Sequence, residues 1–248
     1  MAEKHFIEQR EHAEKYLIPY LRDHCPGIGE FRLLEVGCAE GGFLDALFRQ
    51  GIQAVGLELA PGRVNLAKSI NPKLAIVTGD ITDPHIGKSL GTGYNLIVMR
   101  DVIEHIPDKT AAWTNVVRLL KTGGFLYISF PPRFSPFGGH HQNGRSLLRL
   151  VPYFHMLPDA AVHFLGKRFG EFPHIADNAI ANFRNGLSIY DFEKYCAVFR
   201  LRFVKKDLFI SRPVYQTRFG LKPRRMADVP LLREFLTFGC ECLLQKLP

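Results

Sequence analysis

Short apolar runs alternate with helix-like segments through the first half of the chain, and this order restricts the fold. The apolar runs cover residues 31–36, 53–57, 74–78, 94–99 and 125–130. Helices are predicted between them over residues 43–50, 61–69 and 110–120. Continuously apolar strands that alternate with helices are typical of a parallel sheet covered on both faces. The sequence therefore predicts an α/β fold with a ligand site beyond the carboxyl ends of the strands.

The rest of the chain divides around this core, and we expect all of 1–248 to form one domain. Residues 1–30 supply an N-terminal helix over 4–24, and 31–130 form the cofactor-binding core. Residues 131–187 are rich in proline and aromatics and are too long for an ordinary connection, so they predict a partly helical insertion, or lid, over the acceptor site. Residues 188–248 supply sheet-edge elements. These are helices over 188–199 and 228–238 and strands over 203–211 and 240–244, with the two strands antiparallel.

Charge and cysteine content restrict the kind of protein and the cellular compartment that we expect. The 248 residues carry a formal charge of +8, concentrated between residues 199 and 233, where a solvated basic face is the simplest interpretation. The five cysteines are scattered and form no Cys-x-x-Cys pair, which argues against a disulfide framework or a zinc site. The charged first residues lack the apolar core of a secretory signal, and no apolar run is long enough to span a membrane. We therefore expect a reducing, cytoplasmic setting.

A glycine-rich turn follows the first predicted strand. Gly37 and Gly41 belong to the frame Gly-x-Ala-x-x-Gly, close to the dinucleotide-binding fingerprint, and precede a helix. Glycines permit close backbone approach to a ligand, but they also serve in tight turns that bind nothing. The turn alone is therefore a weak signal.

Two carboxylates sharpen the interpretation of this turn. Glu58 ends the next strand, 21 residues after Gly37, where an acidic residue commonly accepts hydrogen bonds from ribose hydroxyls. Glu35 lies two residues before Gly37 and would repel a pyrophosphate, whereas it would attract an ammonium or a sulfonium group. The pair favours S-adenosylmethionine over a nicotinamide dinucleotide.

Two further polar segments follow predicted strands. Asp80 is placed to accept a hydrogen bond from the adenine amine and Ile81 to pack on the ring, although Asp80 would serve equally well as a loop cap. Residues 100–106 place charged groups where a methionine moiety and an acceptor would meet, although the start of a surface helix would tolerate the same residues.

Five pieces resemble the class I S-adenosylmethionine-dependent methyltransferases in order and spacing: LLEVGCAEGGFL, VGLEL, TGDI, DVIEHIPD and LLKTGGFLYISFPP. The likeness is greatest to the small-molecule O-methyltransferase type, which includes ubiquinone-biosynthesis enzymes, and Ala39 departs from it where many members have glycine. The resemblance implies a Rossmann-like, doubly wound, seven-stranded sheet with its last strand antiparallel and the insertion after the fifth strand. It implies S-adenosylmethionine as cofactor. The residues that it assigns to the cofactor are Glu35, Gly37, Cys38 and Gly41 in the turn, Glu58 at the ribose, Leu59 next to it, Asp80 and Ile81 at the adenine, and Asp101 near the methionine.

Methyl transfer from a sulfonium needs an aligned acceptor, and a hydroxyl acceptor also needs a base, commonly histidine. The candidates are His105, His140 and His141. The Gly138–Gly139 pair would let His140 or His141 point inward, so we favour one of these as base or substrate anchor, with His105 orienting a loop. A histidine pair with purely structural bonds is an equally good interpretation. No acidic or histidine cluster has metal-ligand spacing, and we expect no metal requirement.

The acceptor is predicted to be a small or lipid-like metabolite methylated on oxygen. Nucleic acid is disfavoured as the acceptor for two reasons. Adenine-type amino-methyltransferases have a Pro-Pro motif after the fourth strand, whereas the Pro-Pro pair here follows the fifth. Cytosine carbon-5 methyltransferases need a nucleophilic cysteine after a proline, and none of the five cysteines follows one. The alternatives are an RNA methyltransferase, which the charge allows, and a non-catalytic binding module. The apolar and basic stretch 147–172 has three interpretations: a lid packed on the core, a wall of an acceptor pocket, and a peripheral membrane contact. The sequence does not define the oligomeric state.

Overall fold

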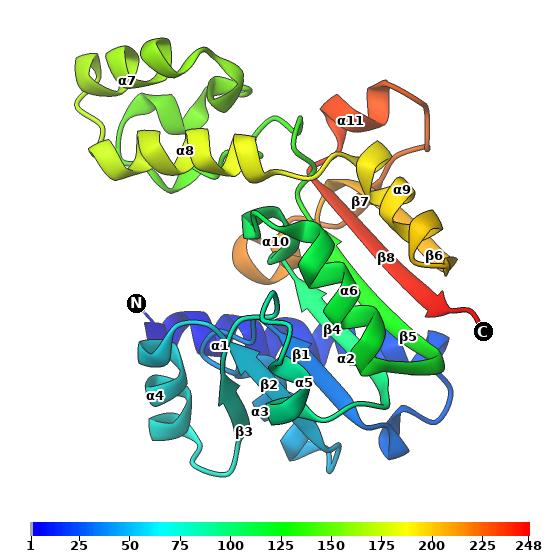
Figure 1. Ribbon diagram of the computed structural model, residues 1–248. Helices are drawn as coiled ribbons and strands as arrows, with labels where there is room; N and C mark the ends of the chain where they lie inside the picture. The colour runs from blue at the N-terminus through cyan, green and yellow to red at the C-terminus, as the bar shows by residue number, and fades with distance from the viewer. Residues whose placement is uncertain (1) are drawn as a thin grey trace.

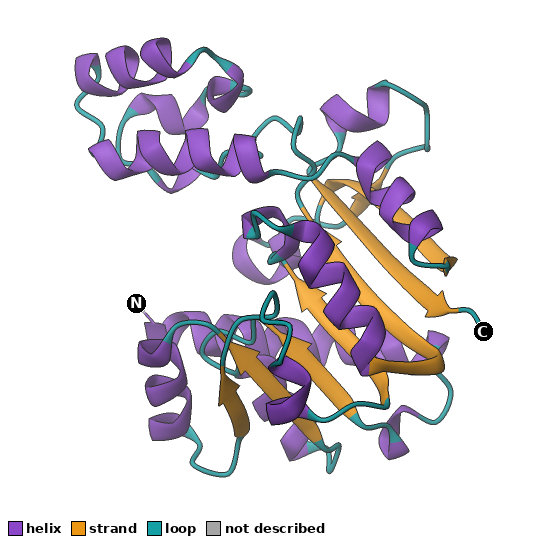
Figure 2. Ribbon diagram, in the orientation of Figure 1, coloured by secondary structure: helices purple, strands orange, loops and turns teal. Residues whose placement is uncertain are grey.

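A computed structural model describes residues 2–248, so only Met1 of the predicted N-terminal segment lies outside it. One mixed sheet runs through the molecule with helices on both of its faces (Figures 1 and 2). The strands are β1 Leu33–Val36, β2 Ala54–Glu58, β3 Ala75–Thr78, β4 Tyr94–Arg100, β5 Leu120–Phe130, β6 Leu201–Ser211, β7 Arg224–Arg225 and β8 Gly239–Lys246. Their order across the sheet is β3-β2-β1-β4-β5-β8-β6-β7.

The topology confirms the predicted α/β class. Strand β1 pairs in parallel with both β2 and β4, so the strand order reverses there and creates the switch point where ligands bind in such sheets. The last strand, β8, is inserted antiparallel between β5 and β6. The expected number of strands was seven, and the sheet has an eighth because the two-residue strand β7 pairs with the end of β6.

Helices form where the sequence predicts them, with two additions. The additions are α5 and α10, which are short and lack a clear apolar period, and the predicted helix 228–238 is reduced to α11. The helices are α1 Ala2–His12, α2 Ile18–His24, α3 Gly42–Arg49, α4 Pro61–Ile70, α5 Ile86–Leu90, α6 Lys109–Leu119, α7 Asp159–Arg168, α8 Pro173–Asn185, α9 Ile189–Val198, α10 Pro213–Phe219 and α11 Leu232–Leu236. Helices α5, α6 and α9 cover one face of the sheet, and α2 and α3 cover the other.

The N-terminal helix is continuous but changes its hydrogen bonding. A π-helical turn, η1 (Ala13–Leu17), joins α1 to α2. Pro19 follows this turn and has no N–H to offer the carbonyl of Lys15, which accounts for the widened turn. Helix α1 then lies directly on α3, where a side chain at Gly42 would collide with the Phe6 carbonyl oxygen at 2.3 Å. The missing side chain of Gly42 therefore allows α1 to pack beside the glycine turn.

The insertion after β5 forms a small helical unit that extends away from the sheet (Figure 1). It contains α7, α8 and the single-turn helices η4 His141–Asn143, η5 Leu147–Leu150 and η6 Phe154–Met156. The unit has its own apolar cluster of Leu148, Phe154, Val162, Ala176 and Ile180.

Candidate active site

A cavity of about 830 Å³ opens beyond the carboxyl ends of the central strands. One part is lined from β2 and β3, here called the β2–β3 end, and includes Glu58, Leu59, Asp80 and Ile81. The other part, the β5–β8 end, is lined by Tyr127, Ser129 and Glu241 from the sheet. Residues of α1 and α10 also line the cavity. The cavity is therefore an elongated site that crosses the switch point.

Glu58 is fixed in position at the β2–β3 end. Its Oε2 accepts a hydrogen bond from the Ala39 amide and its Oε1 accepts one from the Ala60 amide, each at 2.9 Å. The side chain is almost buried yet lines the cavity. A carboxylate held at both oxygens still has lone pairs for two vicinal hydroxyls.

Asp80 and its neighbours complete this end. Asp80 Oδ1 accepts a hydrogen bond from the Thr82 amide at 2.8 Å, as a loop cap would, while the residue also lines the cavity. Ile81 is buried in the wall and Leu59 is exposed at the rim. Both interpretations of Asp80 are thus compatible with its position.

The glycine turn brings backbone close to the ligand space. Gly37 has φ +71°, and a Cβ there would lie 2.3 Å from Val102 Cγ2. Ala39, the departure from the common pattern, also has a left-handed φ of 50°. A glycine would adopt this conformation without strain, so the alanine is held there by the surrounding turn.

Three residues expected at the cofactor do not line the cavity. Glu35 lies behind the wall, where its Oε1 pairs with Arg100 Nη2 at 2.6 Å. Burial raises the pKa of the Glu35 carboxyl to about 7 against the opposing charge of Arg100. Cys38 turns its side chain into the apolar cluster between α3 and α4, and Gly41 caps α3. The attraction of cations that we assigned to Glu35 is therefore largely cancelled by Arg100.

Asp101 lies in the cavity and is paired. Its Oδ1 accepts a hydrogen bond from Arg212 Nη2 at 2.6 Å, and its φ is 53°. Burial alone would raise the pKa of Asp101, but the charge and hydrogen bond of Arg212 lower it. The ion pair connects the loop after β4 to the start of α10.

The candidate histidines divide into two groups. His105 and His140 line the cavity with their rings 5.1 Å apart, and burial lowers the pKa of His140 to about 4. Asn182 Oδ1 lies 3.0 Å from His105 Nδ1, which ties the loop after β4 to α8. His141 does not line the cavity, since it is buried in the insertion with Nε2 2.8 Å from the Val151 carbonyl oxygen. A catalytic role for His141 thus has no support from its position.

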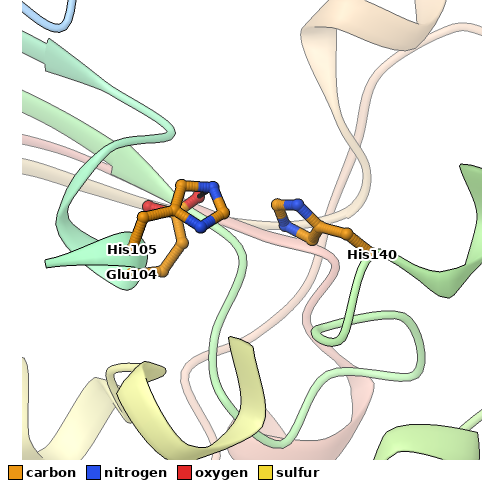
Figure 3. A group of neighbouring side chains, drawn as sticks. All are labelled: Glu104, His105 and His140. Carbon is orange, nitrogen blue, oxygen red and sulfur yellow. Dashed lines mark ion pairs between the residues drawn. The ribbon is translucent and has the colours of Figure 1, made fainter. Parts of the chain in front are cut away.

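Glu104, His105 and His140 bring three potential metal-ligand atoms within 4.8 Å of one another (Figure 3). Glu104 is buried, and neither of its carboxylate oxygens has a hydrogen-bond partner among the described residues. Burial raises the pKa of Glu104 well above its usual value. These groups could hold a cation. Sequence spacing does not reveal the cluster, because His140 is 35 positions from His105.

Sequence reasoning missed several residues that line the cavity. They come from α1, α10 and β8, which no motif connects to the glycine turn. Their recognition requires the packing of α1 on Gly42 and the insertion of β8 beside β5. Among them are His5, Gln9, His12, Val214, Arg218 and Glu241.

Structural comparison places the fold among known methyltransferases. A methyltransferase from Clostridium acetobutylicum matches with a TM-score of 0.62 and 12% identity, over 96% of this chain and 92% of that chain. The plantazolicin methyltransferase BpumL, solved with SAH (S-adenosylhomocysteine), matches with a TM-score of 0.61 and 12% identity, over 97% and 86% of the two chains. At this identity the likeness shows the fold alone.

Sequence comparison adds the family. Residues 6–183 match the family described as a methyltransferase domain. A ubiquinone biosynthesis O-methyltransferase from Vibrio parahaemolyticus is 25% identical over 44% of this chain and 48% of its own length. The enzyme of the same name from Xanthomonas oryzae is 28% identical over 40% and 42%. The chain spans about half the length of the curated relatives it matches. The family match and the sheet topology confirm the resemblance noted above: the chain belongs to the methyltransferase domain family, in its class I S-adenosylmethionine-dependent form.

Proposed function

We propose that the protein transfers a methyl group from S-adenosylmethionine to a hydroxyl oxygen of a small or lipid-like metabolite. The carrying observation is Glu58, which two backbone amides orient into an elongated cavity at the switch point. The names of the curated relatives, which are O-methyltransferases, support oxygen as the methylated atom.

The residues at the β2–β3 end fit a nucleoside. Glu58 would accept hydrogen bonds from the two ribose hydroxyls, Asp80 would accept one from the adenine amine, and Ile81 would pack on the ring. When bound, S-adenosylmethionine supplies an electrophilic methyl group on a sulfonium. The contribution of the chain is to hold the acceptor in line with that methyl group, which by itself lowers the barrier by several kcal/mol.

Calorimetric titration with SAH tests the cofactor assignment. We expect saturable heat and a rise in melting temperature, because a ligand that binds only the folded state stabilises it. NADP is the matched control and should give neither, since Glu58 and Asp80 would lie near its phosphates. Saturable NADP binding, or no response to millimolar SAH, would contradict the assignment.

A lipid-like acceptor is supported by the surface of the insertion. Large apolar side chains stand exposed there, including Leu147 at 70% and Phe164 at 69% exposure. Exposed Arg149, Lys167 and Arg168 lie in the same unit, and apolar and basic residues together suit an anionic membrane surface. None of the described helices is long and apolar enough to cross a bilayer. Of the insertion, His140 and Asn143 line the cavity, whereas α7 and α8 do not.

Vesicle sedimentation tests this membrane contact. We expect the protein to sediment with vesicles of phosphatidylglycerol and phosphatidylcholine but not with phosphatidylcholine alone. The double variant Leu147→Ser and Phe164→Ser should lose the binding, because both side chains would leave the apolar phase. The variant Phe219→Ser removes an equally exposed aromatic outside the insertion and should bind normally. Normal binding by the double variant would rule out the insertion as the docking element.

Two other functions give different results in these assays. An RNA methyltransferase would bind RNA tightly at low salt and lose that binding steeply as salt rises, because phosphate contacts dominate. A non-catalytic module would bind SAH without turning over S-adenosylmethionine on any extract.

A further inference from the structure

Glu241 is a buried carboxylate at the β5–β8 end of the cavity. It lies on β8 in register with Ser129 of β5, which is in turn in register with Arg100 of β4. Two strand spacings, about 10 Å, therefore separate it from the end of β4. The side chain is 4% exposed and lines the cavity.

Two tyrosines hold one oxygen of this carboxylate. Tyr127 Oη donates a hydrogen bond to Glu241 Oε2 at 2.8 Å, and Tyr16 Oη donates one to the same oxygen at 3.0 Å. Burial raises the pKa of both phenols, so they remain protonated donors. Oε1 receives no hydrogen bond from any residue that the structure describes. One oxygen is therefore anchored while the other is available to a ligand.

The surroundings make Glu241 a better base than an exposed carboxylate. Burial raises the pKa of Glu241, although Arg212 and the two tyrosine hydroxyls oppose this effect. Burial lowers the pKa of His140, which makes its imidazole a weaker base. The charged and titratable groups facing Glu241 are Tyr16 of η1, Tyr20 of α2, Asp101 after β4, Tyr127 of β5, Asp207 of β6 and Arg212 before α10.

We propose that the β5–β8 end binds the acceptor, and that Glu241 Oε1 takes the proton of its hydroxyl group. This inference rests on the proposed methyl transfer. The acceptor oxygen attacks the methyl carbon, the O–H bond breaks toward Oε1, and the carbon–sulfur bond breaks with its electron pair left on sulfur. The sulfonium becomes a neutral thioether, and Glu241 later releases the proton to water. Tyr16 and Tyr127 are positioning residues that keep Oε1 turned toward the acceptor.

Single-turnover methylation with radiolabelled S-adenosylmethionine tests this assignment. The probes are three hydroxyl compounds: catechol, benzyl alcohol and 1-octanol. In the variant Glu241→Gln we expect the rate on the methylated probe to fall by about 100-fold or more, because general-base catalysis is lost. SAH affinity should stay unchanged, since the carboxylate lies away from the β2–β3 end. The control Glu11→Gln makes the same chemical change on a half-buried residue of α1 outside the cavity.

The variant Tyr127→Phe separates positioning from packing. Loss of one hydrogen bond to the ionised carboxylate raises the pKa of Glu241 further, so the acidic limb of the rate profile should move to higher pH. A purely structural role would lower the rate at every pH and leave the limb in place, and that result would remove Tyr127 from the proposal.

The outcomes for the two proposals are distinct. Wild-type protein that binds SAH but methylates none of the three probes overturns the hydroxyl-binding assignment and leaves cofactor binding intact. An unchanged rate in Glu241→Gln overturns the role of the base. Failure of wild-type protein to bind SAH overturns the proposed function itself.

Discussion

Replacing Glu58 by alanine is expected to weaken SAH binding by about 100-fold. Hydrogen bonds to a charged partner contribute about 1.5 kcal/mol or more each, so the loss of two ribose contacts amounts to about 3 kcal/mol. The amides of Ala39 and Ala60 would also lose their acceptors, which loosens the turn. Isothermal titration calorimetry measures the change directly.

Two further variants define what the Glu58→Ala result means. Glu58→Gln keeps one carbonyl-type oxygen and should show an intermediate affinity. Glu30→Gln, at an exposed position outside the cavity, should bind SAH as the wild type does. If Glu58→Ala binds SAH normally while its melting temperature confirms folding, the ribose assignment is wrong.

Replacing Gly42 by alanine should destabilise the fold by about 2 to 3 kcal/mol, the range typical of a poorly accommodated added carbon. Its Cβ would lie 2.3 Å from the Phe6 carbonyl oxygen and 2.6 Å from Gln9 Cβ. Backbone cannot move aside as a side chain can, so α1 must shift away from α3. Gln9 would also lose its hydrogen bond from the Gly42 amide. Urea denaturation gives the change in the free energy of unfolding.

The control for Gly42→Ala is Gly62→Ala. Gly62 lies in helix α4 with no atom within 4 Å of an added Cβ, so alanine there should stabilise the protein by about 0.5–1 kcal/mol. Equal unfolding free energies for wild type and Gly42→Ala would contradict the close packing of α1 on α3.

The sheet core and the lining of the β2–β3 end could be predicted, because both depend on short sequence patterns of neighbouring residues. Each of the first five strands contains a short apolar run, although β5 begins at Leu120, before the run predicted over 125–130. Glu58, Asp80 and Ile81 follow strand ends, and parallel strands bring their carboxyl ends to one edge of the sheet. These residues do line the cavity. Their contacts with a cofactor remain a prediction.

Side-chain direction could not be predicted at the first strand end. Neighbouring strand residues point to opposite faces, so Val36 reaches the cavity while Glu35 turns toward Arg100. The proximity of Arg100 depends on how β4 pairs with β1. Glu241 was missed for a similar reason, because its place beside Ser129 exists only once β8 is inserted between β5 and β6.

The walls of the cavity also have a consequence for how the protein matures. Residues 5–12 supply one wall and Glu241 another, so the site draws on segments more than two hundred positions apart. Because a chain is made from its N-terminus, the glycine turn is synthesised long before β8, which supplies Glu241. A chain that stops before β8 would therefore lack Glu241 and with it one wall of the cavity, although the residues of the β2–β3 end would already be present.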